Sequence, residues 1–167
     1  MNIFVPKETW PGETRVPIIP DTIQKLTKCG AMIEIESGMG LAIKYQDEAY
    51  EAVGATISKN PKASIESADI ILRLRPPGKD EVKKLKEGAI HISYLDPFNN
   101  KELIQEFVER KITALCMEMI PRTTIAQKMD ALSSQASLAG YVAVIVAAER
   151  IKKILPMMMT PAGTLVP

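Results

Sequence analysis

The stretch "DTIQKLTKCGAMIEIES", residues 21–37, predicts a helix that leads directly into a strand. Asp21 suits a helix N-cap, and Gly30 suits a helix stop because glycine adopts the left-handed backbone at little cost. In residues 31–37 apolar and charged side chains alternate, which is the two-residue period of a strand. A helix that feeds a strand is part of a βαβ unit, so this stretch favours the α/β class.

The same alternation of strands and helices runs along the rest of the chain. Strands are predicted at residues 2–7, 31–37, 69–75, 89–95 and 112–118, and helices at residues 21–30, 47–55, 79–88, 100–111 and about 130–153. Strands separated by helical stretches connect by right-handed crossovers and pair in parallel. We therefore expect a mainly parallel sheet flanked by helices, flavodoxin-like or Rossmann-like, that ends in a long crossover helix.

The composition is that of an ordinary globular protein without a basic surface. Hydrophobic residues make up 46% and charged residues 25% of the 167 residues, and the formal net charge is +1. This balance gives no reason to expect nucleic-acid binding. Cys29 and Cys116 lack metal-ligand spacing, and we interpret both as buried, reduced thiols, which favours a reducing compartment such as the cytosol. The start, "MNIFVPKETW", lacks the apolar core of a signal peptide.

One uncharged segment, residues 131–148, approaches the length of a membrane span. Its continuous apolar part, residues 138–148, is too short for about 30 Å of hydrocarbon. We therefore expect a helix buried in a core, with no direct membrane span in this chain. The tail "LPMMMTPAGTLVP", residues 155–167, ends like a connector to a further strand, so we expect the chain to be a piece of a larger protein.

Two isolated features suggest chemistry but are better interpreted as structural. Gly38-x-Gly40-x-x-Ile43 follows a strand, yet a dinucleotide-binding loop needs glycine or alanine at its last position, so we interpret it as a glycine-rich turn. His91 is the only histidine, and it alternates with the apolar Ile90 and Ile92 along a strand. We interpret it as a structural or surface residue rather than a catalytic base. A single histidine and no cysteine cluster argue against a zinc site.

Three charged residues stand at the ends of predicted strands. Arg15 lies in the loop after the first strand, Arg75 ends the third and Asp96 follows the fourth. Loops at the carboxyl ends of parallel strands are where α/β proteins bind ligands. The three groups either hold a carboxylate or a ribose, or form a structural ion pair, and their spacing does not choose between the two.

The stretch "IPRTTIAQKMDALSSQASLAGY", residues 120–141, is rich in polar side chains just before an apolar run. Thr124 and Gln127 have the spacing of a capping box, and Asp130 suits an N-cap that complements the helix dipole. On a helix, Gln127, Asp130 and Ser133 would also share one side, with Arg122 just before them. A cation, an amide, a carboxylate and a hydroxyl can read a planar polar group by hydrogen bonds. Capping does not account for Arg122, so helix start and ligand site both stay open.

Four segments together resemble one family: "PKETWPGETRVPIIPDTIQKL", "GLAIKYQDEAYEAVGA", "PRTTIAQKMDALSSQASLAGYVAV" and "MMMTPAGT". They are similar to the first portion of the NAD(H)-binding alpha subunit of proton-translocating NAD(P) transhydrogenases, in the alanine dehydrogenase/transhydrogenase superfamily. The resemblance covers almost the whole chain. It implies an N-terminal α/β domain over residues 1–126, a crossover helix over 127–155, and the start of a truncated nucleotide-binding domain over 156–167.

The resemblance also implies a function for the polar stretch. In the family, the matching residues line the nicotinamide end of NAD(H). Arg122 and Ser133 would contact the nicotinamide side, Asp130 would hold the carboxamide, and Gln127 would bond near the ribose and help orient the two nicotinamides. Gln127 and Asp130 are therefore the residues expected to matter most for catalysis. Hydride would pass from NADH to NADP⁺ without a protein acid or base.

The resemblance implies partners and a location as well. NADP(H) would bind a separate component, and a membrane-spanning component would couple the reaction to proton movement. We expect a homodimer, peripheral to the inner membrane on the cytoplasmic side, or on the matrix side in a mitochondrion. The glycine-rich nucleotide loop of the family would lie beyond Pro167, so the 167-residue chain alone is expected to be inactive.

Two alternatives accompany this expectation. Alanine dehydrogenase shares the fold, but Arg75 stands where that enzyme has a lysine, and Asp96 where it has a histidine. A guanidinium does not exchange protons readily, and an aspartate offers no imidazole, so both departures argue against amino-acid oxidation. Arg15 is kept and has no assigned role. The second alternative is a non-catalytic fragment that serves only in assembly.

Overall fold

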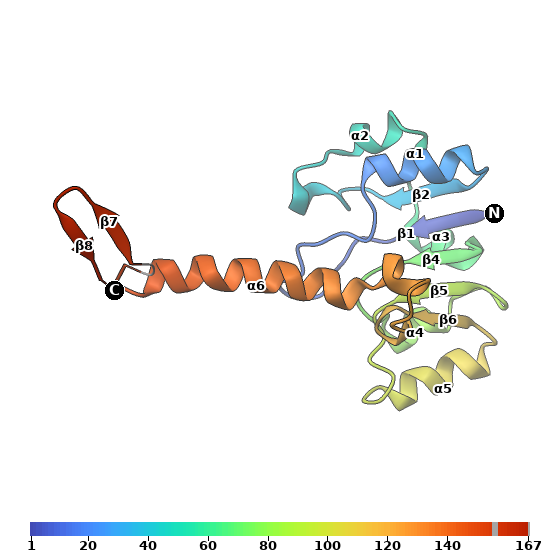
Figure 1. Cartoon of the computed structure of the whole chain (residues 1–167). Helices are drawn as coiled ribbons and strands as arrows, with labels where there is room; N and C mark the ends of the chain where they lie inside the picture. The colour runs from blue at the N-terminus through green and yellow to red at the C-terminus, as the bar shows by residue number, and fades with distance from the viewer. Residues whose placement is uncertain (155–156, 167) are drawn as a thin grey trace. The chain divides into compact units, whose positions relative to one another are not determined.

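The computed structural model describes residues 1–154 and 157–166, which form two compact units (Figure 1). The first unit is Met1–Ile120, and the second begins at Pro121. The domain limits expected at residues 126 and 155 stay predictions, and residues 155, 156 and 167 lie outside the described residues. Each unit is described by itself.

The first unit alternates strands and helices in the order that the sequence predicts. Its strands are β1 (Asn2–Val5), β2 (Met32–Glu36), β3 (Ala55–Ser58), β4 (Ile70–Leu72), β5 (Ile90–Ser93) and β6 (Thr113–Cys116). Its helices are α1 (Pro20–Lys28), α2 (Asp47–Glu51), α3 (Pro61–Ser67), α4 (Lys79–Val82) and α5 (Lys101–Glu109), with 3₁₀ turns η1 (Leu41–Ile43) and η2 (Met117–Met119). The α/β class expected from residues 21–37 is confirmed.

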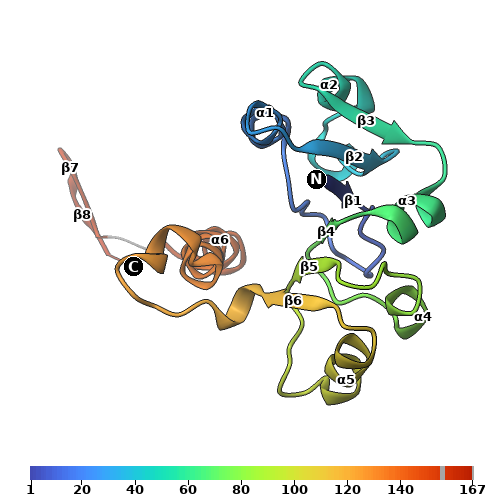
Figure 2. The ribbon, with the colours of Figure 1, turned by 90° about the vertical axis from the view of Figure 1, so that its right-hand side faces the viewer.

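The six strands form one parallel sheet in the order β3-β2-β1-β4-β5-β6. From β1 the chain moves to β2 and β3 on one side, and from β4 it moves to β5 and β6 on the other. Right-handed crossovers in opposite directions place their helices on opposite faces. Figure 2 shows this arrangement, with α1 on one face of the sheet and α3, α4 and α5 on the other.

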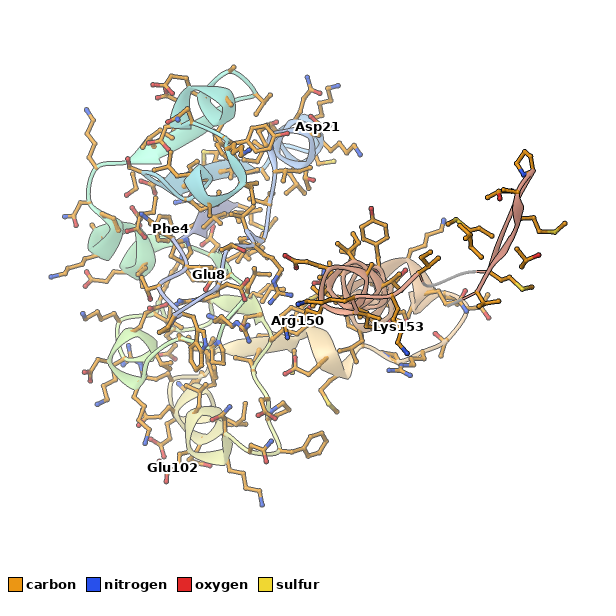
Figure 3. All side chains as sticks on the ribbon, turned by 90° about the vertical axis from the view of Figure 1, so that its left-hand side faces the viewer. Phe4, Glu8, Asp21, Glu102, Arg150 and Lys153 are labelled. Atoms are coloured by element: carbon orange, nitrogen blue, oxygen red, sulfur yellow. The ribbon has the colours of Figure 1, made fainter. Side chains whose placement is uncertain are left out.

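Alternation along each strand fills two cores, one on each face of the sheet. Ile3 and Val5 of β1 pack with Ile23 of α1 and Tyr50 of α2. Phe4 points to the opposite face, where its cluster contains one residue of β4, one of α4 and two of α5, together with residues from the connecting turns. In Figure 3, Phe4 lies among other side chains in the interior, whereas Glu102 of α5 projects outward. Burial on both faces explains the largely apolar strands.

Several local expectations for the first unit are wrong. Asp21 is not the N-cap: α1 starts one residue earlier because Pro20 fits its first turn, and Ile19 takes the cap position. The helix expected over residues 79–88 ends at Val82, and turns then carry Leu85 into the core. The sequence analysis predicted no element over residues 56–67. The structure has β3 there, which begins at Ala55, followed by α3. Gly30 does stop α1, with a φ of 83°.

The two cysteines also differ from expectation. Cys29 is exposed at the end of α1 rather than buried, because the core-facing side of that helix is formed by other residues. Cys116 is half-buried, and burial is the largest cause that raises the pKa of its thiol to about 11. Both are free thiols, and a thiol with a raised pKa is a poor nucleophile.

The second unit contains η3 (Ala126–Met129), the long helix α6 (Ala131–Arg150), and a hairpin of β7 (Met158–Thr160) and β8 (Gly163–Leu165). The prediction that α6 is a buried core helix is wrong, because none of its residues is buried. Several of its large apolar side chains are exposed, among them Leu138, Tyr141, Val144 and Ile145. By length and composition α6 qualifies as a candidate membrane span, which is weak evidence from one helix.

Candidate functional site

The polar stretch before α6 forms a capped helix start. The Asp130 carboxylate accepts a hydrogen bond from the Ser133 backbone N–H at 3.0 Å and another from the Ser133 hydroxyl at 2.6 Å. Asp130 is therefore the N-cap of α6, as expected. The capping box expected at Thr124 is wrong: the backbone oxygen of Thr123 accepts from the N–H groups of Ala126 and Gln127. Thr123 thus forms the turn that precedes η3, whose N-cap is Ile125.

The four predicted site residues thus divide between two local structures. Ser133 lies in the first turn of α6, and Gln127 lies in η3, where its backbone oxygen accepts from the Asp130 N–H at 3.2 Å. Arg122, Gln127 and Ser133 are exposed, and Asp130 is half-buried. The single helical side expected for Gln127, Asp130 and Ser133 is interrupted, because η3 and α6 are separate elements joined at Asp130.

The electrostatics of this stretch favour an ionised Asp130. The Ser133 hydroxyl lowers the pKa of the Asp130 carboxyl, the Ser133 backbone N–H adds to the effect, and the positive charge of Arg122 contributes further. An ionised carboxylate accepts hydrogen bonds only, and a hydroxyl can either donate or accept. The Ser133 hydroxyl already donates its one proton to Asp130, so the stretch can receive an N–H₂ group at the remaining lone pairs of Asp130 and an oxygen at Arg122.

A second polar group lies at the carboxyl ends of β1 and β4 in the first unit. Glu13 bridges two arginines: Arg15 donates from Nε and Nη2 at 2.7 Å each, and Arg75 donates from Nε at 2.7 Å. The Glu13 side chain is only 3% exposed, and its bonds to Arg15 are the largest cause that lowers its pKa to about 2. Of the two interpretations that spacing left open, the structural ion pair is therefore present: Arg15 and Arg75 both pair with Glu13.

Glu13 itself was not predicted from the sequence, although it stands two residues before Arg15. Asp96 does not join the group. It has a positive φ of 48°, and its carboxylate accepts from the Asn99 side chain at 2.9 and 3.0 Å. The convergence expected for Asp96 with the two arginines is therefore wrong, because its own turn engages the carboxylate.

His91 is fully buried in β5, which confirms its interpretation as structural. Its ring lies 5.2 Å from that of Phe107, and the Ser93 hydroxyl lies 3.3 Å from Nδ1. Burial is the main cause that lowers the pKa of His91 to about 3, and nearby Arg73 adds to it. The ring is therefore neutral at physiological pH and lies inside the core.

The glycine-rich turn after β2 is also structural. The Asp47 carboxylate accepts from the Gly38 N–H at 2.8 Å and from the Ser37 hydroxyl at 2.7 Å, so it occupies the place that a phosphate would take. Gly40 is needed for packing, because a Cβ there would lie 2.5 Å from the Tyr50 ring. Among the described residues, no group of three His, Cys, Asp or Glu side chains could hold a metal ion.

Comparison with known proteins gives consistent relatives. The chain is 42% identical over 172 residues to the first of the polypeptides that form NAD(P) transhydrogenase subunit alpha in Rhodospirillum rubrum, and the match aligns 100% of this chain with 45% of that protein. A solved transhydrogenase structure from Sinorhizobium meliloti matches with a TM-score of 0.89 and 41% identity, over 99% of this chain and 49% of that one. Alanine dehydrogenase of Methanococcus maripaludis is 30% identical, over 92% of this chain and 40% of that enzyme.

These matches define both the extent and the family of the chain. It spans between 32% and 45% of the length of the curated relatives it matches. A family model described as "Alanine dehydrogenase/PNT, N-terminal domain" matches residues 4–139, which include β1 to β6 and the start of α6. The parallel sheet agrees with the solved relatives. The chain therefore belongs to the family of alanine dehydrogenase/PNT N-terminal domains.

Proposed function

We propose that this chain is the N-terminal portion of the NAD(H)-binding component of an NAD(P) transhydrogenase. In the whole enzyme, hydride would pass from NADH to NADP⁺ and the transfer would be coupled to proton translocation. The observation that carries the proposal is the 42% identity across the complete chain to a transhydrogenase alpha subunit polypeptide, compared with 30% to an alanine dehydrogenase.

The geometry before α6 fits the nicotinamide end of this cofactor. The ionised Asp130 would accept from the carboxamide N–H₂, and Arg122 and Ser133 would contact the nicotinamide side of the nucleotide. Gln127, exposed in η3, would hydrogen-bond near the ribose and help set the angle between the two nicotinamides. The cofactor supplies the hydride, and the protein residues bind and orient it. No proton-transferring side chain is needed, which suits a chain whose only histidine is buried.

The arrangement of Arg75 and Asp96 does not favour amino-acid oxidation. Arg75 donates to Glu13, and Asp96 accepts from Asn99, so neither group is placed as a proton carrier. A guanidinium also keeps its proton throughout the accessible pH range. Alanine-dependent reduction of NAD⁺ by the intact subunit would contradict this assignment.

The proposal also includes the partner components of the enzyme and its location in the cell. An NADP(H)-binding component and a membrane-spanning component would complete the enzyme, and the subunit would be a homodimer peripheral to the inner membrane. It would face the cytoplasm, or the matrix in a mitochondrion, with α6 in the soluble portion rather than in the membrane. The 167-residue chain alone would be inactive, because it spans less than half of its relatives' length.

The test uses the intact subunit mixed with its NADP-binding component. Asp130→Asn and Gln127→Asn should each reduce the rate of hydride transfer from NADH at least about tenfold, since positioning groups contribute on that scale. Lys128→Gln is the matched control: Lys128 is exposed in the same turn, and its variant should keep the rate. Wild-type rates for both site variants would show that the nicotinamide site lies elsewhere.

A further inference from the structure

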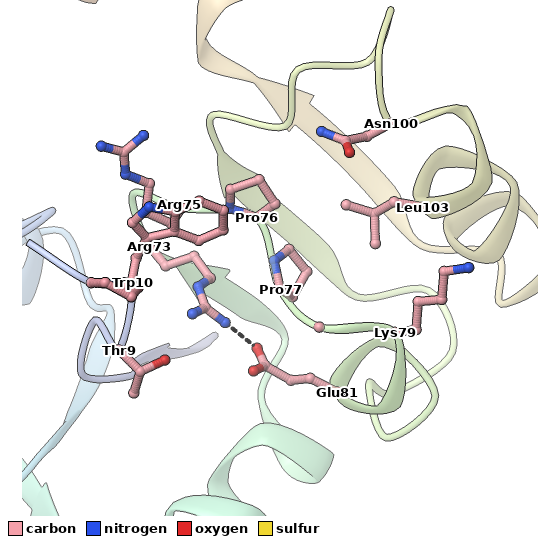
Figure 4. Close-up of a pocket in the computed structure, with 12 residues that line it drawn as sticks. Thr9, Trp10, Arg73, Arg75, Pro76, Pro77, Lys79, Glu81, Asn100 and Leu103 are labelled. Atoms are coloured by element: carbon pink, nitrogen blue, oxygen red, sulfur yellow. Dashed lines mark hydrogen bonds and ion pairs between the residues drawn. The ribbon is translucent and has the colours of Figure 1, made fainter. Parts of the chain in front are cut away.

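Two polar clusters of this chain differ in what their bonds hold in place. The crevice at the carboxyl ends of β1 and β4 has a volume of about 480 Å³, and Arg73, which lines it, pairs with Glu81 (Figure 4). Arg75, another lining residue, pairs with Glu13. The bonds in the crevice therefore join charged side chains to one another. At the start of α6 the bonds converge instead on a single residue, Asp130.

Every polar atom of Asp130 has a hydrogen-bond partner within residues 127–134. Its N–H donates to the Gln127 backbone oxygen at 3.2 Å, and its two carboxylate oxygens accept from the N–H and the hydroxyl of Ser133. Its backbone oxygen accepts from the Ser134 hydroxyl at 3.0 Å. Asp130 is thus held by η3 on one side and by the first turn of α6 on the other.

The Ser134 hydroxyl compensates for a poor backbone bond. At a helix start, the N-cap oxygen usually accepts from the N–H four residues later. Here the Ser134 N–H lies 3.4 Å from that oxygen, beyond the usual range of about 2.7–3.2 Å, whereas the Ser134 hydroxyl lies at 3.0 Å. A hydroxyl rotates to suit its acceptor, so it can reach an oxygen that the backbone N–H meets poorly. The hydroxyl is therefore the better restraint on the Asp130 oxygen.

The backbone oxygen of Asp130 lies at the bend between two elements. Asp130 has a φ of −73° and a ψ of 89°, which is not a helical conformation, so the chain bends between η3 and α6. A bond that fixes the oxygen also fixes this ψ, because the oxygen turns with that dihedral. Gln127 lies before the bend and Ser133 after it. The ψ of Asp130 therefore sets how the proposed nicotinamide contacts are placed relative to one another.

We propose that Ser134 is a positioning residue for hydride transfer, whose hydroxyl fixes the bend at Asp130 and so holds Gln127 and Asp130 in the arrangement that the nicotinamide requires. The inference rests on the proposed function, since Ser134 acts only through those two residues. Its loss should loosen the arrangement and leave the binding groups present. Misplacement of a reacting group by about 1 Å can cost about a hundredfold in rate, so a looser bend should slow the reaction.

Ser134→Ala in the intact subunit separates positioning from stability. Alanine is a better helix former than serine, and a hydroxyl bond to the oxygen four residues earlier slightly destabilises helices, so the variant should melt at the same or a higher temperature. Its kcat for hydride transfer from NADH should nevertheless fall about three- to tenfold, with KM for NADH changed by less than about twofold. Ser134→Thr keeps the hydroxyl and should stay within about twofold of the wild-type rate. Ser137→Ala, also exposed on α6, is the matched control and should keep that rate.

Amide hydrogen exchange in the 167-residue protein tests the restraint without any nucleotide. In Ser134→Ala the Asp130 N–H, which donates to Gln127, should exchange at least about threefold faster than in the wild type, because a freed bend opens that bond more often. Ser137→Ala should leave the exchange of this N–H unchanged.

Three results would overturn the positioning role: unchanged Asp130 exchange in Ser134→Ala, wild-type turnover in that variant, or an equal loss of turnover in Ser134→Thr. A loss of turnover that accompanies a lower melting temperature would assign Ser134 to helix stability alone. Asp130→Asn, assayed beside it, separates this inference from the proposed function. A slow Asp130→Asn with a wild-type Ser134→Ala refutes the positioning role alone, whereas wild-type rates in both refute the nicotinamide site as well.

Discussion

Asp130 and Ser133 are joined twice: the Asp130 carboxylate accepts from both the backbone N–H and the hydroxyl of Ser133, at 3.0 and 2.6 Å. The same carboxylate therefore starts α6 and belongs to the proposed nicotinamide site. A ligand that donates hydrogen bonds to Asp130 would use the lone pairs that the helix cap leaves free.

Removal of the Ser133 hydroxyl should raise the pKa of Asp130. The hydroxyl is the largest cause that holds this pKa below its usual value, so Ser133→Ala removes that cause and leaves the backbone bond. Carboxyl carbon NMR across the acid range would measure it. In the native protein the contribution of Asp130 to stability is present above its unfolded pKa and is lost as pH falls through the folded pKa. An unchanged Asp130 titration in Ser133→Ala would contradict this relationship, and Ser137→Ala, later on α6, serves as the control.

The stability of the first unit should fall steeply below pH 6.5 because of His91. Its pKa is lowered from 6.5 to about 3 in the folded state, so between these values the unfolded chain binds one more proton than the folded chain. The free energy of unfolding then drops by about 1.4 kcal/mol per pH unit as pH decreases. Urea unfolding at pH 7 and pH 5 would measure the drop.

His91→Leu should remove most of this pH dependence near pH 6, since His91 is the only histidine. The variant loses a buried polar group whose Nε2 has no partner among the described residues, so it should still fold. The same steep slope in His91→Leu would assign the proton uptake to another group.

Glu13→Gln should destabilise the protein at neutral pH by about 2 kcal/mol, because two guanidiniums lose their shared charged acceptor. The pKa of Glu13 is lowered to about 2, so its contribution is fully present above its unfolded value near 4.5 and is lost as pH falls through 2. The difference between variant and wild type, measured by urea unfolding, should therefore shrink on acidification. Glu87→Gln, which breaks an exposed pair with Lys111, should have no measurable effect.

Gly40→Ala should destabilise the turn after β2 by about 1–3 kcal/mol through overpacking. A Cβ at Gly40 would lie 2.5 Å from the Tyr50 ring and 2.9 Å from the Tyr45 backbone oxygen, and neither can move away easily. Gly78→Ala is the control, since its φ is −70° and no atom lies within 4 Å of the added carbon. Thermal unfolding would compare the two, and equal melting temperatures would show that the turn can relax.

Features that depend on neighbours along the chain could be predicted from the sequence. Short apolar runs located β1, β4, β5 and β6, two-residue alternation located β2, and Gly30 marked the end of α1 because glycine readily takes the positive φ found there. The cap at Asp130 could be predicted because an N-cap bonds a backbone group three residues away. Local rules for helix starts were wrong where two neighbouring residues could each begin the helix or turn. Pro20 rather than Asp21 lies at the start of α1, and Thr123 rather than Thr124 forms the turn before η3.

Contacts between distant segments of the chain could not be read in this way. Glu13 and Arg75 are 62 residues apart, and only the adjacent pairing of β1 with β4 brings their loops together. The same pairing brings Glu8, in the loop after β1, to the buried Arg73 at the end of β4. The exposure of α6 could not be predicted from the sequence either. An apolar helix is expected to be buried, but its hydropathy does not tell which surface would bury it.

The sequence by itself therefore determined the α/β class, the family and the polar start of α6, since each depends on local pattern or residue identity. The tertiary structure alone decided which charges meet, which are buried and where a crevice opens. Strand order caused this difference: it is set by the packing of both sheet faces at once, and no single segment carries that information.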